Sequence, residues 1–232
     1  MTDIKQFKFF KGIYEKKLDR VSILMTKNLV PGTRVYGENL HRGLDEQGNN
    51  VEFREWTIER SKLGSALRKD VNQIGIKEND YILYLGASSG TTVSHVSDIV
   101  GKDGLVYALD FAPRVLRDLV FVAEQRKNIA PVLADANQPE TYAHLVSEVD
   151  TVFMDIAQKN QAEIFLKNCK MFLKKGGFGL LALKARSVDV TRNPKIIFKE
   201  IREKLEKQMI IVDYRELDPY EKDHAFFVCK KK

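Results

Sequence analysis

The fold is decided by the stretch Tyr81-Ile82-Leu83-Tyr84-Leu85-Gly86-Ala87-Ser88-Ser89-Gly90-Thr91-Thr92. Its first five residues form a nearly continuous apolar run, which is typical of a buried parallel strand. The glycines that follow let the backbone turn tightly and approach a ligand closely before a helix begins. The loop is not the dinucleotide fingerprint, because Ser88 stands where that motif has its second glycine. A plain strand-to-helix turn is the alternative interpretation.

Strands and helices alternate along the chain from Arg60 onward. Repeated strand–helix units require right-handed crossovers, and they predict an α/β fold with a mostly parallel, doubly wound sheet. The last two of about seven strands are too close in sequence for a long helix between them, so we expect an antiparallel hairpin. The strands are expected over residues 81–85, 105–109, 131–134, 150–154, 179–183, 209–214 and 225–229, and the helices over 61–74, 92–100, 113–127, 138–147, 158–173 and 194–207.

Residues 1–55 follow a different pattern and are expected to form a small β-rich N-terminal domain, with 56–232 as the second domain. Short apolar alternations at 21–24 and 51–54 are separated by turn signals such as Pro31-Gly32. These are the usual signs of an antiparallel sheet.

The composition fits a globular protein with a polyanionic partner. The chain has 232 residues, of which 44% are hydrophobic and 30% charged, and its net charge is +6. That charge suits nucleic acid, although many basic proteins bind none. No apolar run is long enough to cross a bilayer and no secretory signal is present, so we expect a cytoplasmic protein without a membrane partner. Cys169 and Cys229 are isolated, which predicts buried, reduced thiols and no metal site.

Three aspartates follow successive strands, at the edge where an open α/β sheet binds its ligands. Asp110 lies about 24 residues after Gly86, the spacing at which a carboxylate accepts hydrogen bonds from ribose hydroxyls. Asp135 ends the next strand and could reach an adenine amino group, although either aspartate could instead cap a helix. Asp155 follows the fourth strand, and the glycine loop contains no Lys or Arg. Because carboxylates suit a sulfonium cation, the pattern favours S-adenosylmethionine over ATP or NAD.

Four polar residues are predicted to meet at the same edge of the sheet. Asp155 and Lys184 each end a strand, and His224 starts the last strand. Lys62 starts the helix before the first strand. Taken singly, each is more often structural, and Lys184 could simply extend its stem to water. Their joint placement favours a catalytic cluster.

Such a cluster can perform an in-line displacement, in which a ribose 2′-hydroxyl attacks a sulfonium methyl group. The hydroxyl is a poor nucleophile until a base takes its proton. Lys184 can be that base if partial burial of its stem and the neighbouring cation Lys62 favour its neutral amine. Asp155 is expected to orient Lys184, and His224 is expected to help position the ribose.

Other polar residues near this edge are given lesser roles. His95 follows the glycine loop, but its position in the middle of a helix predicts a packing role rather than a catalytic one. Arg114 and Arg117 lie on the helix after Asp110 and are candidate phosphate contacts, as are residues 230–232.

At these residues the chain resembles the fibrillarin family, and the resemblance covers nearly the whole sequence. It implies a Rossmann-like class I methyltransferase domain behind a small β-rich N-terminal domain. The matching segments are Arg60-Ser61-Lys62-Leu63, Tyr84-Leu85-Gly86-Ala87-Ser88-Ser89-Gly90-Thr91-Thr92-Val93-Ser94-His95-Val96-Ser97-Asp98, Asp155-Ile156-Ala157-Gln158 and Pro219-Tyr220-Glu221-Lys222-Asp223-His224-Ala225, with Gly37-Glu38 and the Trp56 segment.

The resemblance also implies an activity and its partners. Fibrillarins use S-adenosylmethionine to methylate ribose 2′-hydroxyls in ribosomal RNA and, in archaea, also in transfer RNA. A box C/D guide RNA selects the nucleotide in the target RNA. The enzyme docks on a Nop-family scaffold protein, which sits beside a kink-turn-binding protein of the ribosomal type. The Gly/Arg-rich tail of eukaryotic members is missing here, which implies an archaeal-type protein.

Site residues are implied by the same resemblance. The family is similar to RNA 2′-O-methyltransferases with a Lys-Asp-Lys-Glu tetrad. His224 stands in place of that Glu, and Asp110 stands where many relatives have Glu. The catalytic positions implied are Lys62, Asp155, Lys184 and His224, and the cofactor-binding positions are Gly86, Ala87, Thr91, Thr92, Asp110, Phe111, Asp135, Ala136, Asp155 and Gln158.

Other functions stay open from the sequence alone. One is a methyltransferase that acts on protein glutamine or on a small molecule, although the small molecule is disfavoured by the +6 charge and by the lack of an apolar lid. Another is a non-catalytic RNA-binding or scaffold subunit, against which the complete set of four catalytic positions argues. A dinucleotide-dependent oxidoreductase is disfavoured by Ser88.

Overall fold

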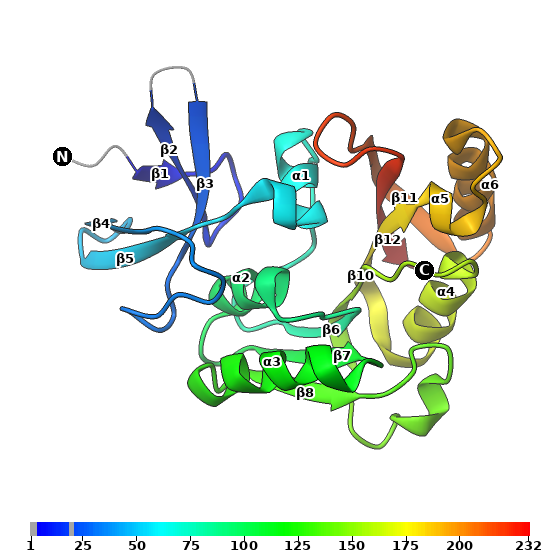
Figure 1. Ribbon diagram of the computed structural model, residues 1–232, viewed down its shortest axis with the longest axis horizontal. Helices are drawn as coiled ribbons and strands as arrows, with labels where there is room; N and C mark the ends of the chain where they lie inside the picture. Colours follow the sequence, from blue (N-terminus) through cyan, green and yellow to red (C-terminus); the bar gives the residue numbers. More distant parts are fainter. Residues whose placement is uncertain (1–3, 19–20) are drawn as a thin grey trace.

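The computed structural model describes residues 4–18 and 21–232, and it contains two separate sheets (Figure 1). The smaller sheet is antiparallel throughout, which confirms the sheet expected near the N-terminus. Residues 1–3, 19 and 20 of the expected N-terminal domain lie outside the described residues. In spatial order the strands are β1 (Ile4–Gln6), β2 (Ile13–Leu18), β3 (Val21–Lys27), β5 (Asn50–Glu55) and β4 (Leu40–Leu44).

The larger sheet has seven strands. The first five of them along the chain run parallel to one another. Strand β12 pairs antiparallel with both of its neighbours. The mostly parallel sheet with an antiparallel terminal hairpin is therefore confirmed. In spatial order the strands are β11 (Met209–Glu216), β12 (His224–Lys231), β10 (Leu173–Lys184), β9 (Val149–Met154), β6 (Tyr81–Leu85), β7 (Leu105–Asp110) and β8 (Ile129–Leu133).

Helices cover both faces of the larger sheet, as repeated strand–helix units require. None of the helices in residues 4–18 and 21–232 is long and apolar enough to cross a bilayer. The helices are η1 (Ile58–Arg60), α1 (Lys62–Arg68), α2 (Thr91–Val100), α3 (Pro113–Gln125), η2 (Pro139–Thr141), α4 (Gln161–Phe172), α5 (Ala185–Val188) and α6 (Pro194–Glu206).

Two helix predictions were wrong, and each has a physical reason. The helix expected over 61–74 ends at Arg68, because Asp70 adopts a left-handed φ of 59° that a continuing helix excludes. The helix expected over 138–147 is only the single turn η2. In that segment Tyr142 is buried, stacks on Phe172 with 5.5 Å between the ring centroids, and donates a hydrogen bond to the Asn168 side chain. Packing of this tyrosine under α4 holds the segment as a loop.

The strand β6 shows why a strand of a parallel sheet consists of consecutive apolar residues. Ile82 and Tyr84 pack into the core under α1, α2 and α3, whereas Leu83 and Leu85 pack into the core under α4 and α6. Successive side chains of a strand point to opposite faces, so a strand covered on both faces must be apolar throughout.

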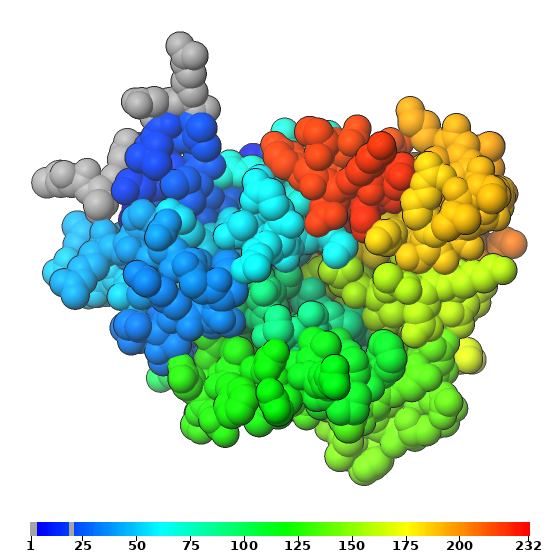
Figure 2. Space-filling model, viewed as in Figure 1, coloured from blue at the N-terminus to red at the C-terminus, as the bar shows by residue number. Residues whose placement is uncertain are grey.

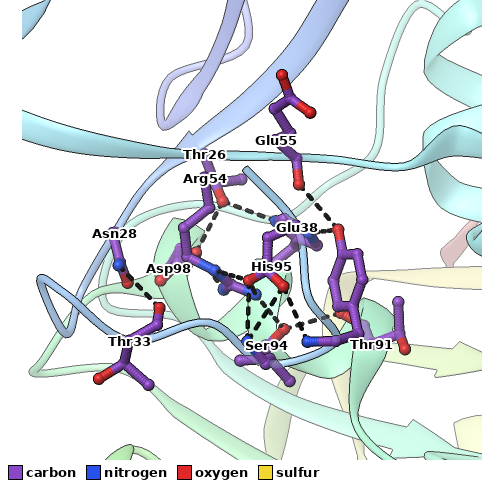
Figure 3. A network of polar contacts seen from close by, with 12 residues as sticks. Thr26, Asn28, Thr33, Glu38, Arg54, Glu55, Thr91, Ser94, His95 and Asp98 are labelled. Carbon is purple, nitrogen blue, oxygen red and sulfur yellow. Dashed lines mark hydrogen bonds and ion pairs between the residues drawn. The ribbon is translucent and has the colours of Figure 1, made fainter. Parts of the chain in front are cut away.

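The two sheets are joined by a shared core and by buried charges. Leu24 and Trp56 belong to the same apolar cluster as residues of α2. Next to that cluster, the fully buried Arg54 donates hydrogen bonds to Glu38 and, over 2.8 Å, to Asp98 (Figure 3). Asp98 also accepts from Arg126 over 2.6 Å. Buried charges are tolerated only when they are paired in this way, so the network fixes the N-terminal sheet against α2.

His95 lies in this junction and not in the candidate active site. Its Nδ1 is 2.7 Å from the hydroxyl of Thr26 (Figure 3). Its Nε2 is 2.6 Å from the Tyr36 hydroxyl, and its ring stacks on Trp56. Burial lowers the pKa of His95 well below its ordinary value, and the nearby guanidinium of Arg54 lowers it further. The neutral, fully packed ring confirms the predicted packing role. Burial of both cysteine thiols is likewise confirmed for Cys169 and Cys229.

Candidate active site

The glycine loop after β6 is shaped by close backbone packing. Gly86 has a φ of +86°, and a Cβ atom at this position would lie 2.3 Å from the backbone oxygen of Asp155. A side chain here would therefore push the loop away from the end of β9. Ser88, at the position that departs from the dinucleotide fingerprint, has a φ of 50° and donates its backbone N–H to Asp110.

Asp110 ties the glycine loop to the end of β7. Its Oδ2 accepts from the backbone N–H of Ser88 over 2.9 Å, and its Oδ1 accepts from the backbone N–H of Ala112 over 3.0 Å. The residue at the N-cap of α3 is Ala112, and no side chain caps that helix. Asp110 thus holds the pocket together rather than capping α3, and each of its oxygens keeps a lone pair for a ligand.

Asp135 organises the opposite wall of the pocket. Its Oδ1 accepts from the backbone N–H of Asn137 over 2.9 Å and from the side-chain amide of the same residue over 3.0 Å. That amide also donates to Gln158 Oε1 over 2.8 Å. The loops after β8 and β9 are therefore linked through one asparagine, which the sequence analysis did not single out.

These loops enclose a pocket at the carboxyl ends of the parallel strands, where this fold binds its ligands. Seven of the ten predicted cofactor positions line it, and Ala87, Thr91 and Thr92 do not. Ala87 packs into the core, and Thr92 donates a hydrogen bond to Ser61. The lining residues are Gly86, Ser88, Leu109, Asp110, Phe111, Ala134, Asp135, Ala136, Asp155, Ile156, Ala157 and Gln158.

Five of these lining residues were missed by the sequence analysis: Ser88, Leu109, Ala134, Ile156 and Ala157. All five lie within three residues of a strand end, and that position was the signal that could have found them. Ser88 was considered only as a departure from the dinucleotide fingerprint, and the other four side chains are apolar, so motif reasoning assigned none of the five to the pocket.

The chemistry of the pocket lining distinguishes between ligands. Three carboxylates line it, and none of the described residues that line it is Lys or Arg. Phosphate groups would be repelled by such a lining, whereas a cation and ribose hydroxyls would be stabilised. The ring of Phe111 is 65% exposed at the pocket, so it is free to stack on a planar base. The lining fits a nucleoside that carries a positive charge.

Lys62 and Asp155 form the centre of the predicted catalytic cluster. Lys62 Nζ lies 3.2 Å from Asp155 Oδ2, and the side chains keep 27% and 20% of their exposure. Ser61 caps α1 by accepting from the backbone N–H of Gly64, which directs the first turn, and with it Lys62, to the end of β9. Burial raises the pKa of Asp155, while the charge of Lys62 and, more weakly, His224 oppose that shift.

Lys184 and His224 are directly opposite each other in the β10–β12 pair. Directly opposed residues project their side chains to the same face of a sheet. His224 Nδ1 is 2.7 Å from the backbone oxygen of Lys222, so Nδ1 carries the proton and Nε2 is left as an acceptor. Burial lowers the pKa of His224, which favours this neutral form.

The structure corrects two expectations about Lys184. Its side chain is exposed, so the partial burial of its stem on which the base role was made to depend is not observed, and the stem extends to water as in the alternative interpretation. The aspartate expected to orient it, Asp155, instead forms an ion pair with Lys62. The pairing of β10 with β9 ends at Leu181, so Lys184 lies beyond the part of β10 that β9 covers.

His224 lies near enough to Lys62 and Asp155 for their charges to affect its pKa. Lys184 lies opposite His224, so segments far apart in the sequence come together here. In Figure 2 the cyan segment with α1 lies beside the red segment that precedes β12, above the green helix α3. Lys69 Nζ donates to the backbone oxygen of Asp218 over 2.9 Å and links these two segments. Arg114 and Arg117 are exposed on α3, where contact with phosphates stays a prediction.

The sheet order, the antiparallel strand β12 and the acidic pocket at the strand ends together define a class I, Rossmann-like methyltransferase fold. The comparisons with known proteins narrow this class. The family model described as "Fibrillarin" matches residues 4–232, and the chain belongs to the fibrillarin family.

Three relatives show how close the similarity is. A protein from Pyrococcus furiosus named fibrillarin-like rRNA/tRNA 2′-O-methyltransferase is 47% identical over 232 residues, with 100% of each chain covered. The solved structure of Aeropyrum pernix fibrillarin with natively bound S-adenosyl-L-methionine is 45% identical, has a TM-score of 0.88 and covers 97% of each chain. A fibrillarin/Nop5p complex contains a chain that is 36% identical, with a TM-score of 0.84, covering 98% of this chain and 100% of that one.

Proposed function

We propose that this protein is an S-adenosylmethionine-dependent RNA 2′-O-methyltransferase, acting on rRNA and tRNA as the catalytic subunit of a box C/D guide ribonucleoprotein. The observation that carries the proposal is an acidic pocket lined by Asp155, which forms an ion pair with Lys62 and acts electrostatically on His224, the residue opposite Lys184. Membership of the fibrillarin family supports the same activity.

The cofactor would occupy the pocket at the strand ends. Bound S-adenosylmethionine supplies an electrophilic methyl group on a sulfonium cation. Asp110 would accept hydrogen bonds from the ribose hydroxyls, Phe111 would stack on the adenine, and Asp135 would accept from its amino group. Asp155, which lies between the pocket and the catalytic edge, would hold the positive end of the ligand. Gly86, Ala136 and Gln158 would line its sides, and Ala87, Thr91 and Thr92 would shape the pocket from behind.

In the proposed reaction each of the four catalytic residues has a distinct task. Lys184, whose side chain is exposed, would take the proton of the ribose 2′-hydroxyl. Lys62 would keep Asp155 ionised, and His224 would accept a hydrogen bond from the ribose through Nε2. Much of the acceleration would come from alignment of the hydroxyl with the methyl group.

The partners fit a protein that does not select its own target. A Nop-family scaffold protein would dock the enzyme, a box C/D guide RNA would select the ribose in the target RNA, and a kink-turn-binding ribosomal-type protein would complete the particle. The solved complex of a related fibrillarin with Nop5p supports the first of these partners. We also propose a cytoplasmic location and a division of the chain into domains at 1–55 and 56–232.

The test is transfer of a labelled methyl group to a guided target RNA, with the guide RNA and both partner proteins supplied. Wild type should methylate one ribose 2′-oxygen, and Lys184→Ala should lose this activity while it still binds S-adenosylmethionine. Lys204→Ala, which removes a surface lysine on α6, is the matched control and should keep full activity. Isolated protein should bind the cofactor but methylate RNA poorly.

Other outcomes would redirect the assignment. Cofactor binding without transfer to RNA would point to another methyl acceptor, such as protein glutamine. Absence of cofactor binding would favour a non-catalytic scaffold subunit.

A further inference from the structure

The side chain of Gln161 holds the backbone of Lys184 at two points. Gln161 Nε2 donates to the backbone oxygen of Lys184 over 3.1 Å, and the backbone N–H of Lys184 donates to Gln161 Oε1 over 3.0 Å. Gln161 is the first residue of α4 and is fully buried. A buried carboxamide that satisfies both polar groups of a single residue is an orienting contact, because it fixes the position and the rotation of that residue's backbone.

The strand pairing explains why Lys184 needs this contact. Ala185 donates its backbone N–H to the oxygen of Asp223 over 3.0 Å, so Lys184 and His224 form the non-hydrogen-bonded pair next to it. In such a pair the backbone N–H and C=O of each residue point away from the partner strand. The backbone N–H and C=O of Lys184 therefore point towards the β9 side of the sheet. The pairing of β9 with β10 ends at Met154. Gln161 fills the place that a longer β9 would have taken.

The side chain of Lys184 has no such support of its own. Within residues 4–18 and 21–232, no hydrogen bond or ion pair reaches its ammonium group, and the side chain is exposed. The position of the Lys184 backbone, from which this side chain extends, is therefore determined by the β12 strand on one side and by Gln161 on the other. In a non-hydrogen-bonded pair the facing side chains are closest, so rotation of the Lys184 backbone would also change its distance to His224.

We propose that Gln161 is a positioning residue for methyl transfer: it aims Lys184 at the ribose 2′-hydroxyl by holding the Lys184 backbone where β9 has ended. This inference rests on the proposed function, in which Lys184 takes the hydroxyl proton. Gln161 is buried and does not line the cofactor pocket. It should therefore affect the methyl-transfer step and leave cofactor affinity unchanged.

The experiment uses the complete guide ribonucleoprotein under single-turnover conditions with saturating S-adenosylmethionine. Gln161→Met keeps the length of the side chain and removes both hydrogen bonds. We expect its methyl-transfer rate to fall by about 10- to 100-fold, the size of effect that a misplaced reacting group produces. The Kd for S-adenosylmethionine, measured in a separate titration, should stay within about twofold of wild type, because Gln161 does not line the pocket.

A double-mutant comparison separates positioning from general damage. If Gln161 acts through Lys184, the variant Gln161→Met/Lys184→Ala should react at the rate of Lys184→Ala alone. The amine that Gln161 positions is absent from both variants. Losses that multiply would overturn the inference, and so would a wild-type rate for Gln161→Met. A wild-type rate for Lys184→Ala would overturn the proposed base itself, which is a separate result.

Two further variants keep the test decisive. Asn128→Leu removes another buried carboxamide that donates to backbone oxygens, those of Ser97 and Gly101, far from this edge. It should lower the melting temperature without slowing methyl transfer, and an equal slowing by Asn128→Leu would contradict a specific role for Gln161. If Gln161→Met does not fold, Gln161→Asn serves instead, because its side chain keeps a polar amide but is one carbon too short to reach both the N–H and the C=O of Lys184. Its rate should fall between those of wild type and Lys184→Ala, and an unchanged rate would overturn the inference.

Discussion

Lys62 and Asp155 come from different elements, a helix that precedes the larger sheet and a loop that follows its β9 strand, yet Lys62 Nζ lies 3.2 Å from Asp155 Oδ2. Burial raises the pKa of Asp155, and the lysine acts in the opposite direction. The pair thus keeps a partly buried carboxylate charged between the pocket and the catalytic edge. Its two members can be tested separately.

Replacement of Lys62 by methionine should make methyl transfer more sensitive to acid. Without the ammonium group the pKa of Asp155 should rise further, because burial is then opposed only by the weaker effect of His224. The acid limb of the pH–rate profile should therefore move to higher pH, with a rate loss of about 100-fold at neutral pH. Lys77→Met, at an exposed loop lysine, is the control. An unshifted acid limb in Lys62→Met would contradict the pairing.

Replacement of Asp155 by asparagine should abolish methyl transfer without a loss of stability at neutral pH. Because the folded pKa of Asp155 lies above its unfolded value, the folded state binds more protons between the two values, and stability falls as the pH rises through that window. Asparagine does not titrate and lacks this fall. Between pH 4 and pH 7, the free energy of unfolding of the wild type, measured by denaturant titration, should fall relative to that of Asp155→Asn. The opposite trend would show that ionised Asp155 stabilises the fold.

Gly86→Ala should weaken the binding of S-adenosylmethionine by about tenfold or more, as measured by calorimetry. The new Cβ would meet the backbone oxygen of Asp155 at 2.3 Å, so the loop or the end of β9 must move. Gly32→Ala is the matched control, because Gly32 has nearly the same φ of +84° and no atom within 4 Å of its Cβ position. Both variants should lose about 1–2 kcal/mol of stability from the left-handed backbone. Equal affinities of Gly86→Ala and Gly32→Ala for S-adenosylmethionine would refute the role of close packing at Gly86.

Arg54→Met should destabilise the protein by about 3–5 kcal/mol, because it leaves buried carboxylates without one of their partners. Glu38 and Asp98 both lose a charge-assisted hydrogen bond in this variant. The control Arg192→Met removes an ion pair with Glu200 whose side chains are 40% and 53% exposed, and such exposed pairs contribute little to stability. Chemical unfolding of both variants gives the comparison. Similar losses would mean that the junction network contributes no more than a surface pair.

The elements that the sequence predicted well are those whose signals are local. The strand β6, the glycine loop and α2 follow from an apolar run, two glycines and the threonines that begin the helix. The same logic placed Asp110, Asp135 and Asp155 at strand ends, because the order of strand and helix is written along the chain. Catalytic and cofactor roles for these residues stay predictions until the variants above are measured.

The predictions that were wrong concern segments whose structure depends on contacts distant in the sequence. Residues 138–147 have acceptable helix composition, but burial of Tyr142 against Phe172 holds most of them as a loop. Lys184 has the place of a half-buried lysine in the sequence, but the end of the β9–β10 pairing leaves it exposed. No local pattern distinguishes these outcomes, because they depend on which distant side chain arrives at the segment.

By itself, the sequence determined the α/β class, the separate N-terminal sheet, the edge of the sheet that holds the pocket and the residue types gathered there. Periodicity, turn residues and strand-end positions are properties of neighbours along the chain, and they need no knowledge of packing. Only the tertiary structure decided that Asp155 pairs with Lys62, that Asp98 joins Arg54 to Arg126, and that Gln161 holds Lys184. Each of these contacts links side chains that come together only when the helices pack on the sheet, so its partners are chosen by packing geometry and by the cost of burying an unpaired polar group.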